Sequence, residues 1–338
     1  MMDWRELWMV TFEQTPPTYH LHPILGSLLY YTATFLIASS LRRLNKAASP
    51  RRLQEFIADF ISTFQTCAVS FENGNSLRLY GWLGLYLVIF TLMMCYARIF
   101  TDSCANPVGN AKKYFQHRQS LMKTLLKLVL QAFSGYCAFQ YVKHFWSLDF
   151  HEYHSIRLQQ KQCYTYLSVS VLLGFLIEGG ATMTDVVLQS HRFVPWKGLN
   201  NVLTCSLLTG LIVSGLSLTG MFFHPAMASS QNFGCKGTTR WEHIVVYWLG
   251  PFVGCFLGVK LNSLIKKATE IPGSTRKSKI VGHKQEKRES SRKMNGTGTC
   301  NSSIDSHRKS KGQTAVRKRV ANSNSVTQMR STSIKRNE

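Results

Sequence analysis

Apolar stretches separated by short polar segments run along the chain from about residue 22 to residue 265. A helix needs roughly 20 mainly apolar residues to cross a lipid bilayer. The pattern predicts seven membrane-spanning helices, at 22–41, 54–71, 82–100, 119–147, 165–189, 196–219 and 241–264. Because no small-residue cleavage site follows the first stretch, we expect a retained anchor there rather than a removed signal peptide.

Positive charges gather in alternate loops between these predicted spans. Cytosolic loops of membrane proteins carry an excess of Lys and Arg. The basic residues after the first, third and fifth spans are Arg42, Arg43, Lys46, Arg51, Arg52, Lys112, Lys113, Arg118, Lys123, Arg192 and Lys197. The intervening segments, such as "SFENGNSLRLY", carry acidic residues and fewer positive charges for their length. The N-terminus is therefore predicted to face the lumen or the exterior, and the C-terminus the cytosol.

Composition changes at the end of the last span. Residues 266–338 hold 19 Lys and Arg against 5 Asp and Glu, so +14 of the chain's net charge of +23 lies there. With few aromatic or branched apolar residues, this tail is predicted to be disordered. Behind a membrane domain it favours contact with anionic lipid over nucleic acid. The chain thus divides into an N-terminal segment with an extra span (1–51), a membrane domain (52–265) and a basic tail (266–338).

The six spans after the first form two sets of three. Each set has an acidic residue in its first span and, at nearly the same distance further on, a polar residue followed by proline. In the first set Asp59 lies within the first span, and Asn106, followed by a proline, comes 47 residues later. In the second set Glu178 lies within the first span, and His224, followed by a proline, comes 46 residues later. Three is an odd number of spans, so the two sets have opposite orientations. This is an inverted repeat about an axis in the membrane plane.

The prolines at 107 and 225 interrupt apolar sequence and predict two re-entrant loops. Non-helical backbone is tolerated at membrane depth only where it is buried in protein or lines a water-filled cavity. Proline suits the first position of a helix, and Asn is a strong N-cap. Two short helices that begin at these sites would direct the positive ends of their dipoles at the midplane. Such an arrangement repels cations and admits a neutral molecule.

Four stretches in the same order carry a family resemblance: "ADFISTFQTCA", "SCANPVGN", "LTGMFFHPAMA" and "VVYWLGPFVGCFLG". Two asparagine-proline-alanine loops in an inverted repeat are the aquaporin pattern. The chain resembles the superaquaporin branch of that family over residues 52–265, and Cys235, nine residues after Ala226, matches the cysteine typical of the branch. The resemblance implies an all-α membrane fold of six transmembrane helices and two re-entrant half-helices, here with an additional N-terminal span.

The resemblance also assigns roles to individual residues. It implies that the two pore motifs consist of Asn106, Pro107, Val108, His224, Pro225 and Ala226. Met227 stands where the family usually has the Arg of the selectivity filter, and a weaker offset adds Ile212, so an apolar filter is expected. Asp59 and Glu178 would accept hydrogen bonds from the backbone of the re-entrant loops. Asp185, seven residues after Glu178, either shares its helix face or lies near the membrane interface.

His224 is the main departure from the family pattern, because it replaces an Asn. A neutral imidazole can donate with one nitrogen and accept with the other. We consider three interpretations: a pore-lining donor whose protonation closes the channel at acid pH, a plain cap that packs, or a side chain that blocks the pore.

Nine cysteines give no CxxC pair and no Cys/His cluster with metal-ligand spacing, so no metal site is expected. Cys163 and Cys235 fall in predicted lumenal segments, where a disulfide can form. Cys235 has three interpretations: a packing residue that holds the second half-helix, which we favour, a disulfide partner of Cys163, or a redox-sensitive thiol.

The function implied by the resemblance is passive movement of water or a small neutral solute, such as glycerol or hydrogen peroxide, without catalysis or cofactor. No nucleophile and base set or phosphate-binding loop indicates an enzyme. The family implies a homotetramer, and the branch implies an intracellular membrane, particularly the endoplasmic reticulum. The alternative is a non-conducting membrane scaffold that acts through its basic tail.

Overall fold

The computed structural model describes residues 21–160 and 162–269, which belong to one compact unit, Met1–Ile271. Residues 1–20 and 270–338 lie outside the described part, and the predicted tail falls there almost entirely. The described helices are α2 (Pro23–Ala48), α3 (Arg51–Ile99), α4 (Pro107–Phe115), α5 (Leu121–Trp146), α6 (Glu152–Gln159), α7 (Val171–Leu188), α8 (Lys197–Thr219), α9 (Pro225–Asn232), α10 (Arg240–Ile244), the π-helical turn η1 (Val245–Leu249) and α11 (Gly250–Thr269).

Helix α3 contains two of the predicted spans. It bends at Gly81, where φ is 65° and ψ is −163°, a left-handed conformation that glycine adopts without steric cost. The prediction of a loop between residues 71 and 82 was wrong, because the helix continues to this glycine. Glu72 and Asn75 are buried there, and the Asn75 amide donates to the Glu72 carboxylate at 3.0 Å. Hydrogen-bond partners within the protein replace the water molecules that these two side chains would contact in an exposed loop.

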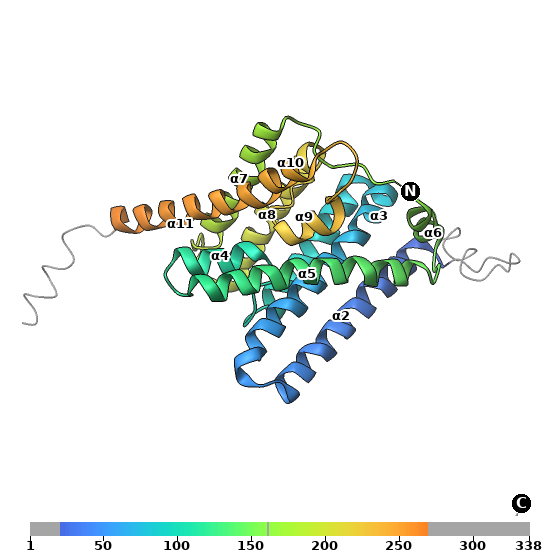
Figure 1. The fold of residues 1–338 in the computed structure, drawn as a ribbon, viewed down its shortest axis with the longest axis horizontal. Helices are drawn as coiled ribbons and strands as arrows, with labels where there is room; N and C mark the ends of the chain where they lie inside the picture. The colour runs from blue at the N-terminus through green and yellow to red at the C-terminus, as the bar shows by residue number, and fades with distance from the viewer. Residues whose placement is uncertain (1–20, 161, 270–338) are drawn as a thin grey trace, which may run out of the picture. The chain divides into compact units, whose positions relative to one another are not determined.

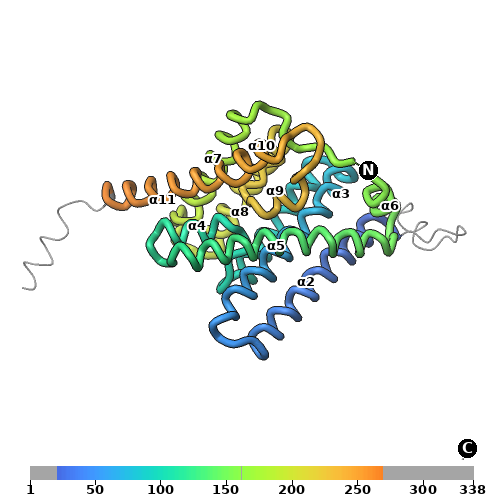
Figure 2. Tube along the Cα trace, in the orientation of Figure 1, coloured from blue at the N-terminus to red at the C-terminus, as the bar shows by residue number. Residues whose placement is uncertain are grey.

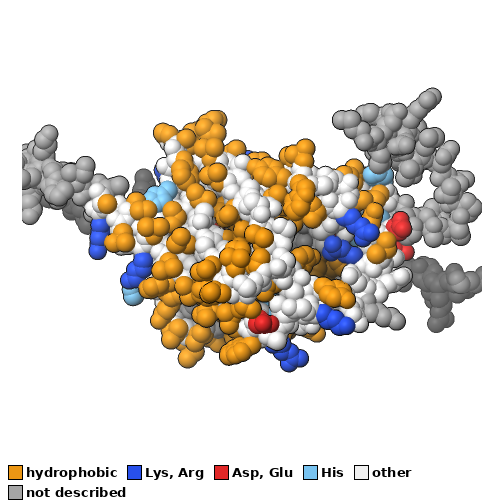
Figure 3. Space-filling model, turned by 90° about the horizontal axis from the view of Figure 1, so that it is seen from above, with side chains coloured by type: hydrophobic (Ala, Val, Ile, Leu, Met, Phe, Trp, Pro, Cys, Tyr) orange, Lys and Arg blue, Asp and Glu red, His pale blue; other side chains and the backbone are white. Residues whose placement is uncertain are grey.

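Five described helices are long and apolar enough to cross a membrane: α2, α3, α7, α8 and the continuous segment Arg240–Ala268. The predicted span at 119–147 is the helix α5, which is not among these five because it carries polar residues such as Lys127 and Gln131. Those two side chains are buried, whereas Leu125, Val129 and Phe133 are exposed. Apolar side chains also cover much of the face shown in Figure 3.

The helix contacts follow the predicted repeat (Figure 1 and Figure 2). Helix α3 packs on α5 in the first half, and α7 packs on α11 in the second. Each short helix contacts the last helix of the other half, α4 on α11 and α9 on α5, and α4 also contacts α9. Helix α2 packs on α3 outside this arrangement. The described fold is therefore an all-α membrane fold with two matching halves and one added helix.

Glycines allow the closest approaches between helices. A Cβ added at Gly254 of α11 would lie 2.0 Å from the carbonyl oxygen of Gly179 in α7. A Cβ at Gly135 of α5 would lie 2.8 Å from the carbonyl oxygen of Ala226 in α9. Small residues let helix backbones approach closely in membranes. The close contact of α7 with α11 therefore depends on these glycines.

Candidate functional site

The two short helices begin at residues that also tie the re-entrant loops together. Asn106 caps α4, because its Oδ1 accepts from the Val108 amide at 2.9 Å, and its Nδ2 donates to the Phe223 carbonyl at 3.0 Å. His224 caps α9, because its Nδ1 accepts from the Met227 amide at 3.2 Å. Its Nε2 lies 2.9 Å from the Ala105 carbonyl. Each cap therefore bonds to the carbonyl just before the other cap.

These contacts define which nitrogen of the His224 ring carries the proton. A carbonyl oxygen only accepts, so Nε2 carries the proton, and Nδ1 must be unprotonated to accept from Met227. The neutral imidazole thus reproduces both bonds of the Asn106 amide, and His224 is buried. Both nitrogens are engaged within the protein, which favours the cap interpretation over a donor to the pore. The neighbouring residues of the predicted pore motifs, Pro107, Val108, Pro225 and Ala226, are also buried.

Asp59 in α3 holds the first loop through a buried polar network. Its Oδ1 accepts from the Cys104 amide at 2.7 Å, and its Oδ2 accepts from Asn110 at 3.1 Å. Lys127 of α5, whose side chain is 0% exposed, places its Nζ 2.9 Å from the same Oδ2 and also pairs with Glu55. Sequence reasoning missed Lys127. Its spacing of four residues from Gln131, within an apolar helix, was the available signal of an inward polar face.

Glu178 in α7 holds the second loop. Its carboxylate accepts from the Phe222 and Phe223 amides at 3.1 and 2.6 Å, and from the Thr219 hydroxyl at 2.6 Å. Met221 and Phe223 have φ values of 44° and 32°, which are uncommon for residues with a side chain. Such backbone persists only where surrounding contacts determine it. Glu178 supplies those contacts.

Residues of these loops line two cavities. One, of about 480 Å³, is lined by residues of α4, α7 and α8, and the other, of about 360 Å³, by residues of α3, α8 and α9. Their walls share five residues: Met93, Tyr96, Asn106, Asp185 and Gln189. The shared wall coincides with the first N-cap. Residues from both halves of the fold thus line both cavities beside the junction of the loops.

The predicted filter residues lie on the second cavity. Met227 and Ile212 are both on its wall, which is mostly apolar. Arg157 of α6 is on the same wall, and its Nη1 donates to the Phe71 carbonyl at 3.3 Å. Sequence reasoning did not single out Arg157, because it lies between predicted spans and outside the motifs of the family.

Asp185 belongs to the interior. Its side chain is buried on α7, lines both cavities and accepts from the Gln189 amide at 2.7 Å. Of the two predicted positions, the helix face of Glu178 and the membrane interface, Asp185 therefore occupies the inward-facing one.

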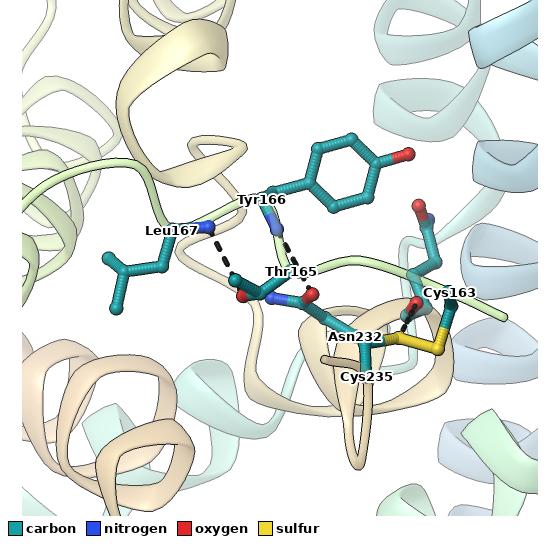
Figure 4. Close-up of a disulfide and its surroundings, with 7 residues drawn as sticks. Cys163, Thr165, Tyr166, Leu167, Asn232 and Cys235 are labelled. Atoms are coloured by element: carbon teal, nitrogen blue, oxygen red, sulfur yellow. Dashed lines mark hydrogen bonds between the residues drawn. A yellow bond between two sulfur atoms is a disulfide. The ribbon is translucent and has the colours of Figure 1, made fainter. Parts of the chain in front are cut away.

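Cys235 forms a disulfide with Cys163, 72 residues away (Figure 4). Our preference for a purely packing role was wrong. The segments that carry the two cysteines are also joined by backbone hydrogen bonds. The Lys236 amide donates to the Cys163 carbonyl, and the Thr165 amide donates to the Lys236 carbonyl. The Tyr166 amide donates to Asn232 Oδ1 at the end of α9. These bonds bring the cysteines together, and the disulfide anchors the chain that leaves α9.

No family model matches the sequence. An aquaporin-12 from Mus musculus is 29% identical over 248 residues, which cover 70% of this chain and 84% of that protein. An aquaporin-11 from Milnesium tardigradum is 24% identical over 242 residues, which cover 71% of this chain and 88% of that protein. The chain is a relative of the superaquaporin branch of the aquaporin family.

One further relative and one solved structure are also similar to this chain. A putative aquaporin-12A from Homo sapiens is 28% identical and covers 70% of this chain and 79% of that protein. A solved aquaglyceroporin from Plasmodium falciparum aligns with a TM-score of 0.47 and 16% identity, over 62% of this chain and 96% of that chain. The family resemblance predicted from the sequence is confirmed. The aquaporin-like chain is a multi-pass membrane protein, and its relatives support a membrane channel rather than an enzyme.

Proposed function

We propose that the chain is a passive channel for water or a small neutral solute, such as glycerol or hydrogen peroxide. The single observation that carries this proposal is the shared wall of the two cavities at Asn106 and Asp185. A channel needs a path between two compartments, and a scaffold has no use for one. The N-termini of α4 and α9 meet at this place, so their dipoles favour neutral over cationic solutes.

Arg157 supports this proposal as a fixed positive charge on the second cavity. Met227 is uncharged at the position where the family usually has Arg, and Arg157 enters the same cavity from α6. We expect Arg157→Gln to increase cation leak while permeability to neutral solutes is retained. The readout is potassium and proton flux in proteoliposomes. The matched control, Arg78→Gln, changes an exposed arginine and should leave the flux unchanged.

Stopped-flow permeability of proteoliposomes tests the proposal with water, glycerol and hydrogen peroxide. Ile212→Trp fills the second cavity and should abolish most permeability. Ile37→Trp makes the same change on α2, where Ile37 is 41% exposed, and should have no effect. Permeability above that of empty liposomes, lost only in Ile212→Trp, supports a channel. Folded protein that is silent for all three solutes favours the scaffold alternative instead.

The finer site roles belong to the same proposal. Asn106 and His224 act as caps that tie the loops together, Met227 and Ile212 form an apolar filter, and Asp59 and Glu178 hold the loops. The disulfide supports a lumenal or exterior position for residues 163 and 235, because disulfides persist in oxidising compartments. On this orientation the tail is cytosolic and can contact anionic lipid. A homotetramer and an endoplasmic-reticulum location rest on the family resemblance alone.

A further inference from the structure

Three ionisable side chains converge outside the pore, where α2, α3 and α6 meet. They are Glu72, His151 and His154, and all three are fully buried. His154 Nε2 lies 3.3 Å from Glu72 Oε2, and His151 Nε2 lies 3.5 Å from Glu72 Oε1. The candidate ligand atoms all lie within 4.8 Å of one another. The imidazole centroids are 3.7 Å apart.

The histidines of this cluster are poorly satisfied by the protein. Neither nitrogen of His151 has a hydrogen-bond partner among the described residues, and the same holds for Nδ1 of His154. Leaving a buried polar group without a partner costs about 1–3 kcal/mol. Glu72, in contrast, is held in place by the Ser27 hydroxyl at 2.5 Å and by Trp146 Nε1 at 3.3 Å. An oriented carboxylate thus faces two imidazoles, of which only His154 hydrogen-bonds to it among the described residues.

This donor set fits a divalent metal ion. Two imidazoles and one carboxylate are a common set of three protein ligands for Zn²⁺, which binds N and O at about 2.0–2.2 Å. Ligand atoms of a tetrahedral site with such bonds are about 3.3–3.6 Å apart. Measured to the single atom Glu72 Oε1, the distances from His154 Nε2 and His151 Nε2 are 3.4 and 3.5 Å, which fall in this range. All three ligand atoms lie within 4.8 Å of one another, so a small inward shift of the two imidazoles completes the geometry.

We propose that Glu72, His151 and His154 form a Zn²⁺ site that fastens α2 and α6 to the body of the fold. The Glu72 partner Ser27 belongs to α2, and a Cβ added at Gly26 would lie 2.3 Å from His151 Cδ2, so α2 packs directly on the site. His154 belongs to α6, and Arg157 follows it by three residues on the same helix. Zinc at this site therefore fixes the helix that brings Arg157 to the cavity. Binding itself does not depend on whether the pore conducts.

Metal content of the purified full-length chain tests the site. The tag-free protein is stripped with EDTA, incubated with Zn²⁺, washed and analysed by mass spectrometry, with thermal unfolding measured in parallel. We expect one Zn²⁺ per chain, with a higher melting temperature that EDTA reverses. Glu72→Gln and His154→Gln should weaken binding by more than about 100-fold, beyond the 10–100-fold loss typical of outer-shell changes. The control His144→Gln alters an exposed histidine of α5 and should bind like wild type.

Two results overturn the proposal. One is wild-type protein that retains no zinc, in which case the cluster is an ordinary imidazole–carboxylate ion pair. The other is equal binding by wild type and both ligand variants, which locates the metal elsewhere on the chain. If the variants do not fold, X-ray absorption of the zinc-loaded wild type decides. Only nitrogen and oxygen neighbours at about 2.0–2.2 Å support the site, and a sulfur neighbour at about 2.3 Å contradicts it.

Discussion

Asp59 and Glu178 hold equivalent loops in the two halves by different chemistry. Asp59 receives one loop amide, from Cys104, and is neutralised by the buried Lys127. Glu178 receives two loop amides and one hydroxyl, and no ion pair in the described part of the chain involves it. The first loop therefore depends on an ion pair, and the second on several uncharged donors.

This difference shows that the repeat preserves geometry rather than particular contacts. A buried charge must be paired or hydrogen-bonded, and either solution is sufficient. The two solutions respond differently to mutation, because loss of one ion partner leaves an uncompensated charge, whereas loss of one donor among several does not. Variants in each half can therefore distinguish the two kinds of contact experimentally.

The largest expected effect is that of Lys127→Leu in the first half. The variant leaves Asp59 buried without its counter-ion, which costs about 3–5 kcal/mol of unfolding free energy. Lys123→Leu is the matched control, because Lys123 pairs with Glu55 at a partly exposed site and should contribute less than about 1 kcal/mol. Denaturant unfolding in detergent measures both. Equal losses in the two variants would show that burial of the Asp59 pair is unimportant.

Glu178→Gln in the second half should have an intermediate effect. The amide has one oxygen to accept with, and its NH₂ group faces loop donors. Hydrogen bonds to a charged acceptor, each worth about 1.5–3 kcal/mol, are therefore weakened or lost. We expect faster hydrogen exchange at residues 219–224, with exchange at residues 104–110 unchanged. Glu152→Gln, at an exposed position of α6, serves as control. Unchanged protection of the second loop would contradict the role given to Glu178.

His224→Asn should have the smallest effect, because it makes the two caps alike. Asn106 already forms both bonds with an amide, so the variant should change unfolding free energy by less than about 1 kcal/mol. Permeability of proteoliposomes at neutral and acid pH provides the second measurement. We expect the same pH response from both proteins. Closure of the wild type alone at acid pH would instead support the gating hypothesis and contradict a cap role.

The positions of the helices and of the two loop-holding carboxylates were predictable from the sequence. Apolar length set the spans, and the matched spacing of Asp59 to Asn106 and of Glu178 to His224 set the repeat. The extent of α3 was not predictable, because Glu72 and Asn75 look like loop residues until their partners are known. The disulfide was one of three open interpretations of Cys235. The hydrogen bond from the Tyr166 amide to Asn232, which lies far away in the sequence, brings Cys163 close to it.

The sequence by itself determined which segments form long apolar helices and where the two short helices begin, because both depend on local composition and on proline. Only the tertiary structure decided which polar groups share a site. Lys127 meets Asp59, Glu72 meets His151 and His154, and Arg157 reaches the cavity beside Met227. These groups lie on different helices, and the rotation of each helix about its axis follows from packing of the whole fold. The sequence pattern within one helix does not determine that rotation.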